Sequence, residues 1–175
     1  MKDLVVKLLN SAQVDQGIGT MEFSVFNLSD TVSNAMLPFD SIFYEQEKEL
    51  DSDIQDDILI RGSQSHLIQV VDILLDNAQK YSCERGHTWV SLKRQSTKHC
   101  LLTVANEGAA LSARERKDIF KRFYRADAAR KRTGSYGLGL SIAEGIVKAH
   151  KGKIWVESKN GINTFAIQLP IICDI

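Results

Sequence analysis

The chain of 175 residues lacks several features that mark specialised classes of protein. No apolar stretch approaches the roughly 18 residues of a membrane-spanning helix, and the first residues lack the apolar core of a signal peptide. The 22 basic and 22 acidic residues cancel, which excludes the strong positive field of a non-specific nucleic-acid binder. Three cysteines without a C-x-x-C pair argue against a disulfide framework and a structural zinc site. We therefore expect a cytoplasmic chain that lies outside the membrane and has no nucleic-acid partner.

The length of 175 residues and the apolar content of 43% allow one domain with a sizeable core. We expect a single α/β domain with an N-terminal appendage. Helical spacing predicts an amphipathic helix over residues 1–12, which either packs on the main body or ends a longer helix. The order of the other elements predicts a two-layer sandwich of about three helices on a mixed sheet of five or so strands. Longer helices are expected over about 28–48, 63–82 and 137–150, a short one from Ser112, and strands over 21–26, 57–61, 88–93, 100–105, 154–157 and 164–169.

Three local signals refine this prediction. Pro38 falls inside the helix expected over 28–48 and should bend or divide it. The segment Ser112-Ala113-Arg114-Glu115 is a capping-box sequence, and Asn160-Gly161 is typical of a tight hairpin turn. Residues 125–136 are basic and alanine-rich, have little apolar periodicity and are followed by Gly137, so we expect them to be mobile.

The helix expected over 63–82 carries the first chemical motif. Its core stripe is formed by Leu67, Val70, Val71, Leu74, Leu75, Ala78 and Tyr81. Asn77 borders this stripe, and Lys80 and Tyr81 project to the same side. An amide oxygen can coordinate Mg²⁺, an ammonium can neutralise phosphate, and an aromatic ring can pack on a purine. From this helix alone, an ordinary helix flank is the favoured interpretation.

Gly137-Leu138-Gly139-Leu140-Ser141 opens the next long helix and carries the second motif. A helix N-terminus presents unpaired N–H groups, and glycines let an anion approach that backbone closely. No Gly-Lys-Ser/Thr follows, so this is not a Walker A sequence, and it does not begin a βαβ unit as a Rossmann fingerprint does. The two motifs together predict a pocket for a nucleoside triphosphate, held by a fold that is neither a P-loop fold nor a Rossmann fold.

These residues resemble the catalytic domain of sensor histidine kinases over about residues 20–170. Leu74–Ser82 resembles the N box, Asn106-Glu107-Gly108 a modified G1 box, Ile119–Arg125 the F box, and Gly137–Ser141 the G2 box. The resemblance implies a Bergerat-type ATP-binding fold. It divides the chain into residues 1–17, the C-terminal remnant of a dimerisation helix, and residues 18–175, the catalytic ATP-binding domain, with an ATP lid at about 107–136.

The resemblance also implies roles for single residues. Asn77 matches the asparagine that binds Mg²⁺, Lys80 a contact on the phosphate side, and Tyr81 a residue lining the adenine pocket. Asn106 stands where the family usually has an aspartate that accepts the adenine amino group. An amide oxygen can accept the same bond without charge assistance, so we expect weaker or less base-selective binding. Gly108 is retained, whereas Ala110 replaces the second G1 glycine.

The remaining roles concern the lid and the reaction class. Phe120 and Phe123 match the aromatic residues that hold the lid, and Arg125 is a candidate lid cation. Ile73 occupies the position of the general-base glutamate in ATP-hydrolysing relatives, and isoleucine cannot take a proton. The complete set of expected nucleotide-binding residues is Asn77, Lys80, Tyr81, Asn106, Gly108, Ala110, Leu111, Phe120, Phe123, Tyr124, Arg125, Tyr136, Gly137, Leu138, Gly139, Leu140 and Thr164.

The resemblance predicts that the chain binds Mg·ATP and donates its γ-phosphoryl group to a histidine on a separate dimerisation domain, with a response regulator downstream. None of His66, His87, His99 and His150 is followed by an acidic residue, as the family's acceptor histidine is, so autophosphorylation of this monomeric chain is not expected. The departures at Ile73, Asn106 and Ala110 keep open an ATP-sensing or pseudokinase module without phosphotransfer. A serine kinase of the anti-sigma type shares the fold, but the F box argues against it. A pure interaction domain would leave the glycine motif unexplained.

Overall fold

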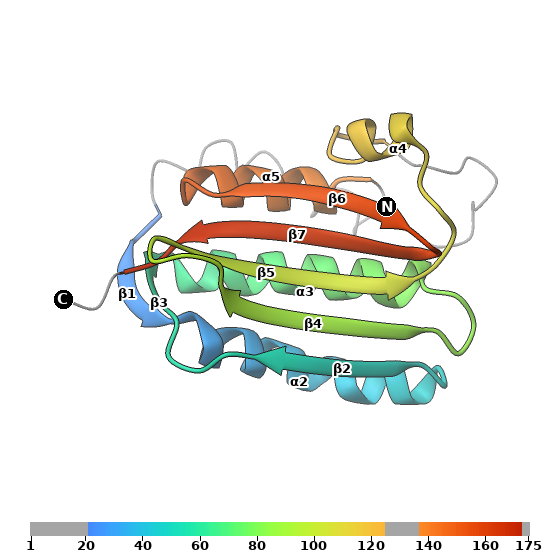
Figure 1. Cartoon of the computed structure of the whole chain (residues 1–175), viewed down its shortest axis with the longest axis horizontal. Coiled ribbons are helices and arrows are strands. Elements are labelled where there is room, and N and C mark those ends of the chain that lie inside the picture. The colour runs from blue at the N-terminus through green and yellow to red at the C-terminus, as the bar shows by residue number, and fades with distance from the viewer. Residues whose placement is uncertain (1–20, 125–136, 173–175) are drawn as a thin grey trace, which may run out of the picture.

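A mixed five-stranded sheet forms one layer of the computed structural model, which describes residues 21–124 and 137–172 (Figure 1). The strands in spatial order are β2 (Glu49–Ile54), β4 (His87–Arg94), β5 (His99–Glu107), β7 (Ile162–Pro170) and β6 (Lys153–Lys159). Only the pairing of β2 with β4 is parallel among these strands. A separate two-stranded sheet joins β1 (Ser24–Asn27) to β3 (Leu59–Gly62). The helix expected over 1–12 and the segment 125–136 lie outside the described residues.

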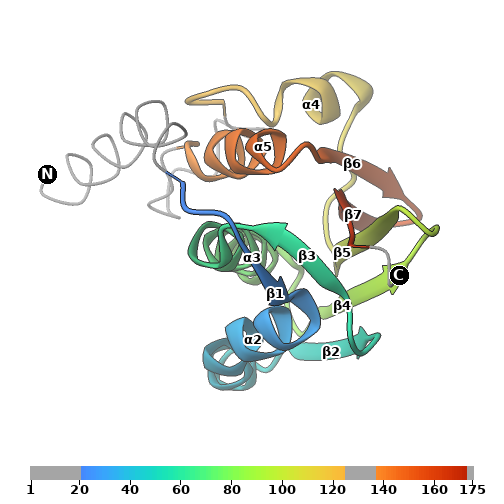
Figure 2. The same cartoon turned by 90° about the vertical axis from the view of Figure 1, so that its left-hand side faces the viewer.

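Three helices stack along one face of the five-stranded sheet (Figure 2). They are α2 (Leu28–Glu45), α3 (Gln64–Tyr81) and α5 (Gly139–Ala149), and the short α4 (Ala113–Asp118) lies near β6. The two-layer α/β sandwich is therefore confirmed. Each helix in the described ranges is too short or too polar to cross a lipid bilayer.

Helix α2 begins where the sequence predicts it. The Asn27 side chain accepts a hydrogen bond from the backbone N–H of Asp30 at 3.3 Å, which caps the helix. The helix ends at Glu45, three residues before the expected Lys48, and it continues through Pro38 without being divided. Pro38 and Asn34, whose carbonyl loses its partner, both lie on the exposed side, where water can satisfy that carbonyl. The expected division at Pro38 is therefore wrong.

Strand β2 is absent from the elements expected from the sequence. Leu50, Ser52 and Ile54 alternate with the acidic Glu49, Asp51 and Asp53, and β2 forms one edge of the sheet. Leu50 and Ile54 are only half-buried, because an edge strand has one neighbour. Three aspartates or glutamates in six residues hide this weak apolar signal. The strand forms through parallel pairing with β4, which local sequence does not report.

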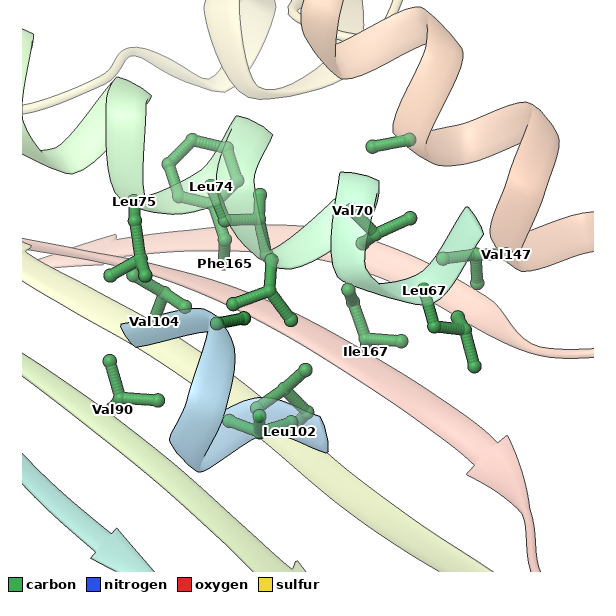
Figure 3. Close-up of a cluster of buried hydrophobic side chains, with 14 of the residues drawn as sticks. Leu67, Val70, Leu74, Leu75, Val90, Leu102, Val104, Val147, Phe165 and Ile167 are labelled. Carbon is green, nitrogen blue, oxygen red and sulfur yellow. The ribbon is translucent and has the colours of Figure 1, made fainter. Parts of the chain in front are cut away.

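The core lies between α3 and the sheet (Figure 3). Leu74 and Leu75 project from α3 toward Val104 of β5 and Phe165 of β7. Six of the seven residues expected in the α3 stripe are buried, and Tyr81, at the end of the helix, is half-buried. The capping box at Ser112 and Glu115 is also confirmed. This apolar layer fixes the direction of α3 and thereby the position of its polar flank.

Candidate nucleotide-binding site

The two motifs found in the sequence meet where α3 passes the start of α5. A Cβ built on Gly139, the first residue of α5, would lie 3.2 Å from Cγ2 of Ile73 on α3. Asn77 follows Ile73 by one turn and is half-buried. The N-cap residue Leu138 makes no capping hydrogen bond through its side chain, so among the described residues the first N–H groups of α5 remain available to an anion. An amide oxygen and a helix N-terminus therefore lie on neighbouring helices.

Lys80 supplies a cation one turn beyond Asn77. Its Nζ lies 2.6 Å from Oδ2 of Asp76, an ion pair across one turn of α3 in which the Lys80 side chain is 24% exposed and that of Asp76 is 51% exposed. Partly exposed pairs of this kind contribute little net free energy. Lys80 can therefore exchange Asp76 for a phosphate oxygen at small cost.

Four polar side chains form a row across one end of the sheet, on the face that the helices cover. Asn106 of β5 pairs in register with Thr88 of β4 and with Asn163 of β7, and Asn163 pairs with Ser158 of β6. We call Thr88, Asn106, Asn163 and Ser158 the polar row. Thr88, Asn106 and Asn163 are buried, and Asn106 is only 2% exposed. The row lies at the end of the sheet where β5 ends and β7 begins, on the right in Figure 1.

Several buried polar atoms at this end have no hydrogen-bond partner within the described part of the chain. They are Oγ of Ser82, Oγ1 of Thr88 and Oδ1 of Asn163. Buried polar groups are nearly always satisfied in proteins, so three unsatisfied atoms in one place indicate a site for an exogenous polar group. A Cβ on Gly108 would lie 3.1 Å from Nδ2 of Asn106 and 3.4 Å from Nδ2 of Asn163. These hydroxyls and amides fit the polar edge of a nucleobase.

The same row anchors the chain that follows β5. Nδ2 of Asn163 donates to the Ala109 carbonyl at 2.9 Å, and Oγ of Ser158 accepts from the Leu111 N–H at 2.9 Å. The Gly108 N–H donates to the Gly161 carbonyl at 2.9 Å. Gly108 and Leu111 therefore lie beside the row, whereas the Ala110 side chain is exposed.

The F-box residues meet the G2 glycine. Phe120 is half-buried and makes an edge contact with Phe165, with ring centroids 6.5 Å apart. The Phe123 side chain is 60% exposed, and its N–H donates to the Gly137 carbonyl at 3.0 Å. A Cβ on Gly137, which has φ of +69°, would lie 2.5 Å from the Tyr124 carbonyl oxygen. Residues on either side of the segment 125–136 thus meet.

Other predicted site residues are placed differently. Leu138 and Leu140 are buried in the core, so their backbone N–H groups, not their side chains, are available to a ligand. Arg125 and Tyr136 lie outside the described residues. Thr164 pairs with Ala105, so its side chain is on the opposite face of the sheet from the polar row. The structure does not bring Thr164 together with the other residues.

Sequence reasoning missed Asn163, Ser82 and Thr88. A signal for Asn163 exists, because side chains alternate along a strand and the apolar Phe165, Ile167 and Leu169 mark the inward face. Asn163, two residues before Phe165, must then face inward, and Thr164 outward. For Thr88 and Ser82 the signal depends on strand register, which local patterns do not supply.

The described residues contain no cluster of three or more histidine, cysteine or acidic side chains that could hold a metal ion. Asn77 offers one amide oxygen, which fits Mg²⁺ held mainly by phosphate oxygens and water. A hollow of about 770 Å³ at the other end of α3 is lined by Glu22, Phe23, Ser24 and residues 63–66, which differ from the predicted site residues.

Comparison with known proteins agrees with this geometry. A family model described as histidine kinase-, DNA gyrase B- and HSP90-like ATPase matches residues 62–172. Sensor protein DltS of Streptococcus agalactiae serotype III is 37% identical over 171 residues, which cover 98% of this chain and 43% of DltS. The chain thus spans less than half the length of that relative.

Solved structures share the fold. The catalytic domain of histidine kinase ThkA matches with a TM-score of 0.75 and 24% identity, over 86% of this chain and 96% of that one. Full-length ShkA in complex with AMPPNP matches with a TM-score of 0.82 and 18% identity, over 98% of this chain and 37% of ShkA. ThkA has also been solved with the response regulator protein TrrA, and there the TM-score is 0.75 at 20% identity, over 96% of this chain and 49% of that one. The chain belongs to the family of histidine kinase-, DNA gyrase B- and HSP90-like ATPases, and it is homologous to the catalytic ATP-binding domains of sensor histidine kinases.

Proposed function

We propose that the chain binds Mg·ATP between α3 and α5 and donates the γ-phosphoryl group to a histidine on a separate dimerisation domain. The observation that carries this proposal is the contact of Gly139 with Ile73, which sets the uncapped N-terminus of α5 beside the helix turn that ends at Asn77. Family membership supports ATP binding and a role in two-component signalling.

Each end of the nucleotide has a matching set of groups. The N–H groups at the start of α5 and the Lys80 ammonium face the triphosphate, and the Asn77 amide oxygen supplies a ligand to Mg²⁺. Asn106 and Asn163 meet the base, and we replace Thr164 by Asn163 in this role because only Asn163 shares the face of Asn106. Bound Mg²⁺ neutralises the phosphate charge that develops during transfer.

The transfer must be to a protein group and not to water. Ile73 has no acid–base chemistry, so the chain lacks a base at the position from which ATP-hydrolysing relatives activate water. Phosphoryl transfer depends mainly on positioning and electrostatic stabilisation. A histidine presented by a partner domain can then attack the γ-phosphorus while this chain holds the nucleotide.

The partners follow from this assignment. We propose that residues 18–175 form the catalytic domain and that a response regulator acts downstream, as TrrA is paired with ThkA. The chain acts in the cytoplasm as a monomer. The balanced charge gives no support to a nucleic-acid partner.

An ATP-sensing module without phosphotransfer is the second candidate function. It is favoured by Ile73, Asn106 and Ala110, each of which departs from the common kinase pattern. A sensor needs tight binding and a conformational response, whereas a kinase must also release ADP after transfer.

Calorimetric titration with ATP tests the proposal, with and without Mg²⁺, on the native chain, Asn77→Ala and Asn34→Ala. Asn34 is an exposed asparagine on α2 and serves as the matched control. We expect ATP binding that depends on Mg²⁺. In Asn77→Ala the affinity should fall about 100-fold, because the bound Mg²⁺ loses its ligand from the protein. In Asn34→Ala the affinity should be unchanged. No binding to the native chain would overturn the proposal.

Phosphotransfer is tested by adding a histidine-bearing dimerisation domain in trans with labelled ATP. Label on that domain identifies a kinase, and tight binding without label identifies a sensor. Label on a histidine of this chain alone would contradict the assignment of the acceptor to another domain.

A further inference from the structure

The polar row contains hydroxyls and amides but no charged side chain, and this has a consequence for base selection. We propose, on the basis of the nucleotide site assigned above, that the site accepts 6-oxo purines nearly as well as 6-amino purines, because the Asn106 amide can present either its oxygen or its nitrogen to the base. The substrate class is then purine nucleoside triphosphates more broadly than ATP.

The orientation of Asn106 in the structure suits a 6-amino purine. Its Nδ2 donates to the Glu107 carbonyl at 3.2 Å, which turns Oδ1 away from that carbonyl. Oδ1 can accept from an exocyclic amino group. Rotation of the amide by half a turn exchanges the two atoms, so that Nδ2 can donate to a 6-oxo oxygen. The rotation gives up one long hydrogen bond within the chain and turns Oδ1 toward the Glu107 carbonyl, so the orientation for a 6-amino purine is the preferred one. An ionised carboxylate at this position has only acceptors and would repel the same oxygen.

The neighbours of Asn106 can adapt to either orientation. Thr88, its register partner on β4, and Ser82 each carry a hydroxyl that donates or accepts by rotation, and neither hydroxyl has a hydrogen-bond partner within residues 21–124 and 137–172. A backbone N–H or carbonyl at either position could only donate or only accept, and would therefore favour one of the two kinds of purine. These hydroxyls therefore remove the usual penalty of an unmatched donor or acceptor.

Asn163 adds an acceptor on the other side of Asn106. Its Nδ2 is committed to the Ala109 carbonyl at 2.9 Å, and its Oδ1 is buried without a partner in the described residues. A 6-oxo purine carries a hydrogen on N1, whereas a 6-amino purine does not. The Asn163 oxygen is therefore a group of the kind that a 6-oxo purine needs, and we assign Asn163 as a second specificity-determining residue.

The experiment compares Mg·ATP with Mg·ITP, because adenine and hypoxanthine differ at position 6 and at the N1 hydrogen. Both are titrated by calorimetry into the native chain, Asn106→Asp and Asn163→Ala. Asn34→Asp adds the same charge at an exposed position on α2 and serves as the control. Loss of one neutral hydrogen bond changes affinity by about tenfold or less, so we expect the native chain and Asn34→Asp to prefer ATP by no more than that.

Both variants should raise the preference for ATP, by different amounts and for different reasons. In Asn106→Asp a buried carboxylate opposes the 6-oxo oxygen, and the preference for ATP should rise above about 100-fold. Asn163→Ala should weaken ITP several-fold more than ATP. Thermal unfolding establishes that each variant is folded, and the native ratio remains decisive if one is not.

The outcomes separate this inference from the proposed function. If ATP fails to bind the native chain, the proposed function fails. If ATP binds and ITP binds the native chain more than about 100-fold less tightly, the proposed function stands and this inference fails. An ATP preference that Asn106→Asp leaves unchanged in a folded chain also overturns the inference.

Discussion

Two buried polar clusters lie at opposite ends of α3, and they differ in how their hydrogen bonds are satisfied. At the N-terminal end, Nε2 of His150 accepts from the Ser63 N–H at 2.9 Å, and Nδ1 donates to the Ile146 carbonyl at 2.8 Å. The ring also stacks on Phe23, with centroids 4.8 Å apart. At the C-terminal end, Ser82 and the polar row hold three buried atoms without a partner in the described residues.

The difference separates a structural cluster from the cluster that we propose binds the base. His150 uses both ring nitrogens within the protein, so it stabilises the packing of α5 against β3 and α3 and has nothing to offer a ligand. The role of His150 is therefore structural. The polar row keeps atoms unsatisfied at a cost in stability, which is typical of sites that bind a polar ligand.

Replacing Gly62 by alanine should break the satisfied cluster and have the largest effect on stability. A Cβ there would lie 2.5 Å from Cδ2 and 2.8 Å from Nε2 of the buried His150 ring. The ring cannot move without losing its bond to Ser63. We expect Gly62→Ala to lower the free energy of unfolding by about 3 kcal/mol, measured by urea denaturation.

Gly161→Ala is the matched control for this prediction. Gly161 has φ of +77°, and a Cβ there meets nothing within 4 Å. The substitution therefore costs only backbone strain, about 1 kcal/mol. Equal losses in the two variants would show that the His150 ring is free to yield.

The pH dependence of stability should report on the same cluster. Burial lowers the pKa of His150 below its usual value, and the nearby His66 adds to this effect. The unfolded chain then binds more protons at His150 than the folded chain does once the pH falls below about 6.5. The contribution of neutral His150 to the free energy of unfolding is fully present above about pH 6.5. It is lost as the pH falls from there through the lower pKa of His150 in the folded chain. We expect the free energy of unfolding to decline at acidic pH, by an amount set by the difference between the pKa values of His150 in the unfolded and folded chains.

Unfolding measured between pH 8 and pH 5 checks this expectation in the native chain, His150→Gln and His99→Gln. The decline at acidic pH should become shallower in His150→Gln only, because glutamine does not titrate. His99 begins β5, where it is half-buried, and serves as the control. The same decline in His150→Gln and the native chain would contradict the assigned role.

Two buried threonines test the comparison of the two clusters, and their replacement should have the smallest effect on stability. Thr88 and Thr31 are both buried, but Oγ1 of Thr31 donates to the Asn27 carbonyl at 2.7 Å and accepts from Nε2 of Gln64 at 3.1 Å. Valine removes the hydroxyl while keeping the shape. We expect Thr88→Val to raise the free energy of unfolding by about 0.5 kcal/mol and Thr31→Val to lower it by about 1 kcal/mol.

The affinity for Mg·ATP should not follow the change in stability. Mg·ATP affinity should fall in Thr88→Val and stay unchanged in Thr31→Val, measured by calorimetry. A loss of stability in Thr88→Val would mean that its hydroxyl is satisfied in solution, and the contrast between the two clusters would then disappear at this position.

Local chemistry made much of the fold predictable. The three-and-four spacing of apolar residues defined α3, and Asn160-Gly161 defined the last hairpin, where both residues have positive φ, +53° and +77°. Asn77 was found because its place beside the apolar stripe follows from the same spacing. Strand β2 was missed because its pairing with β4, and not its own composition, makes it a strand.

By itself, the sequence determined the elements, the apolar face of each helix and the two motifs, because these depend on residues a few positions apart. Only the tertiary structure decided that Thr88, Asn106 and Asn163 share one row and that Thr164 faces away. Strand register sets such neighbours, and a shift of one residue would turn every side chain of a strand to the other face. The proposed base-binding end of the site is therefore a property of the assembled sheet, whereas the proposed phosphate end is already visible in two short segments of sequence.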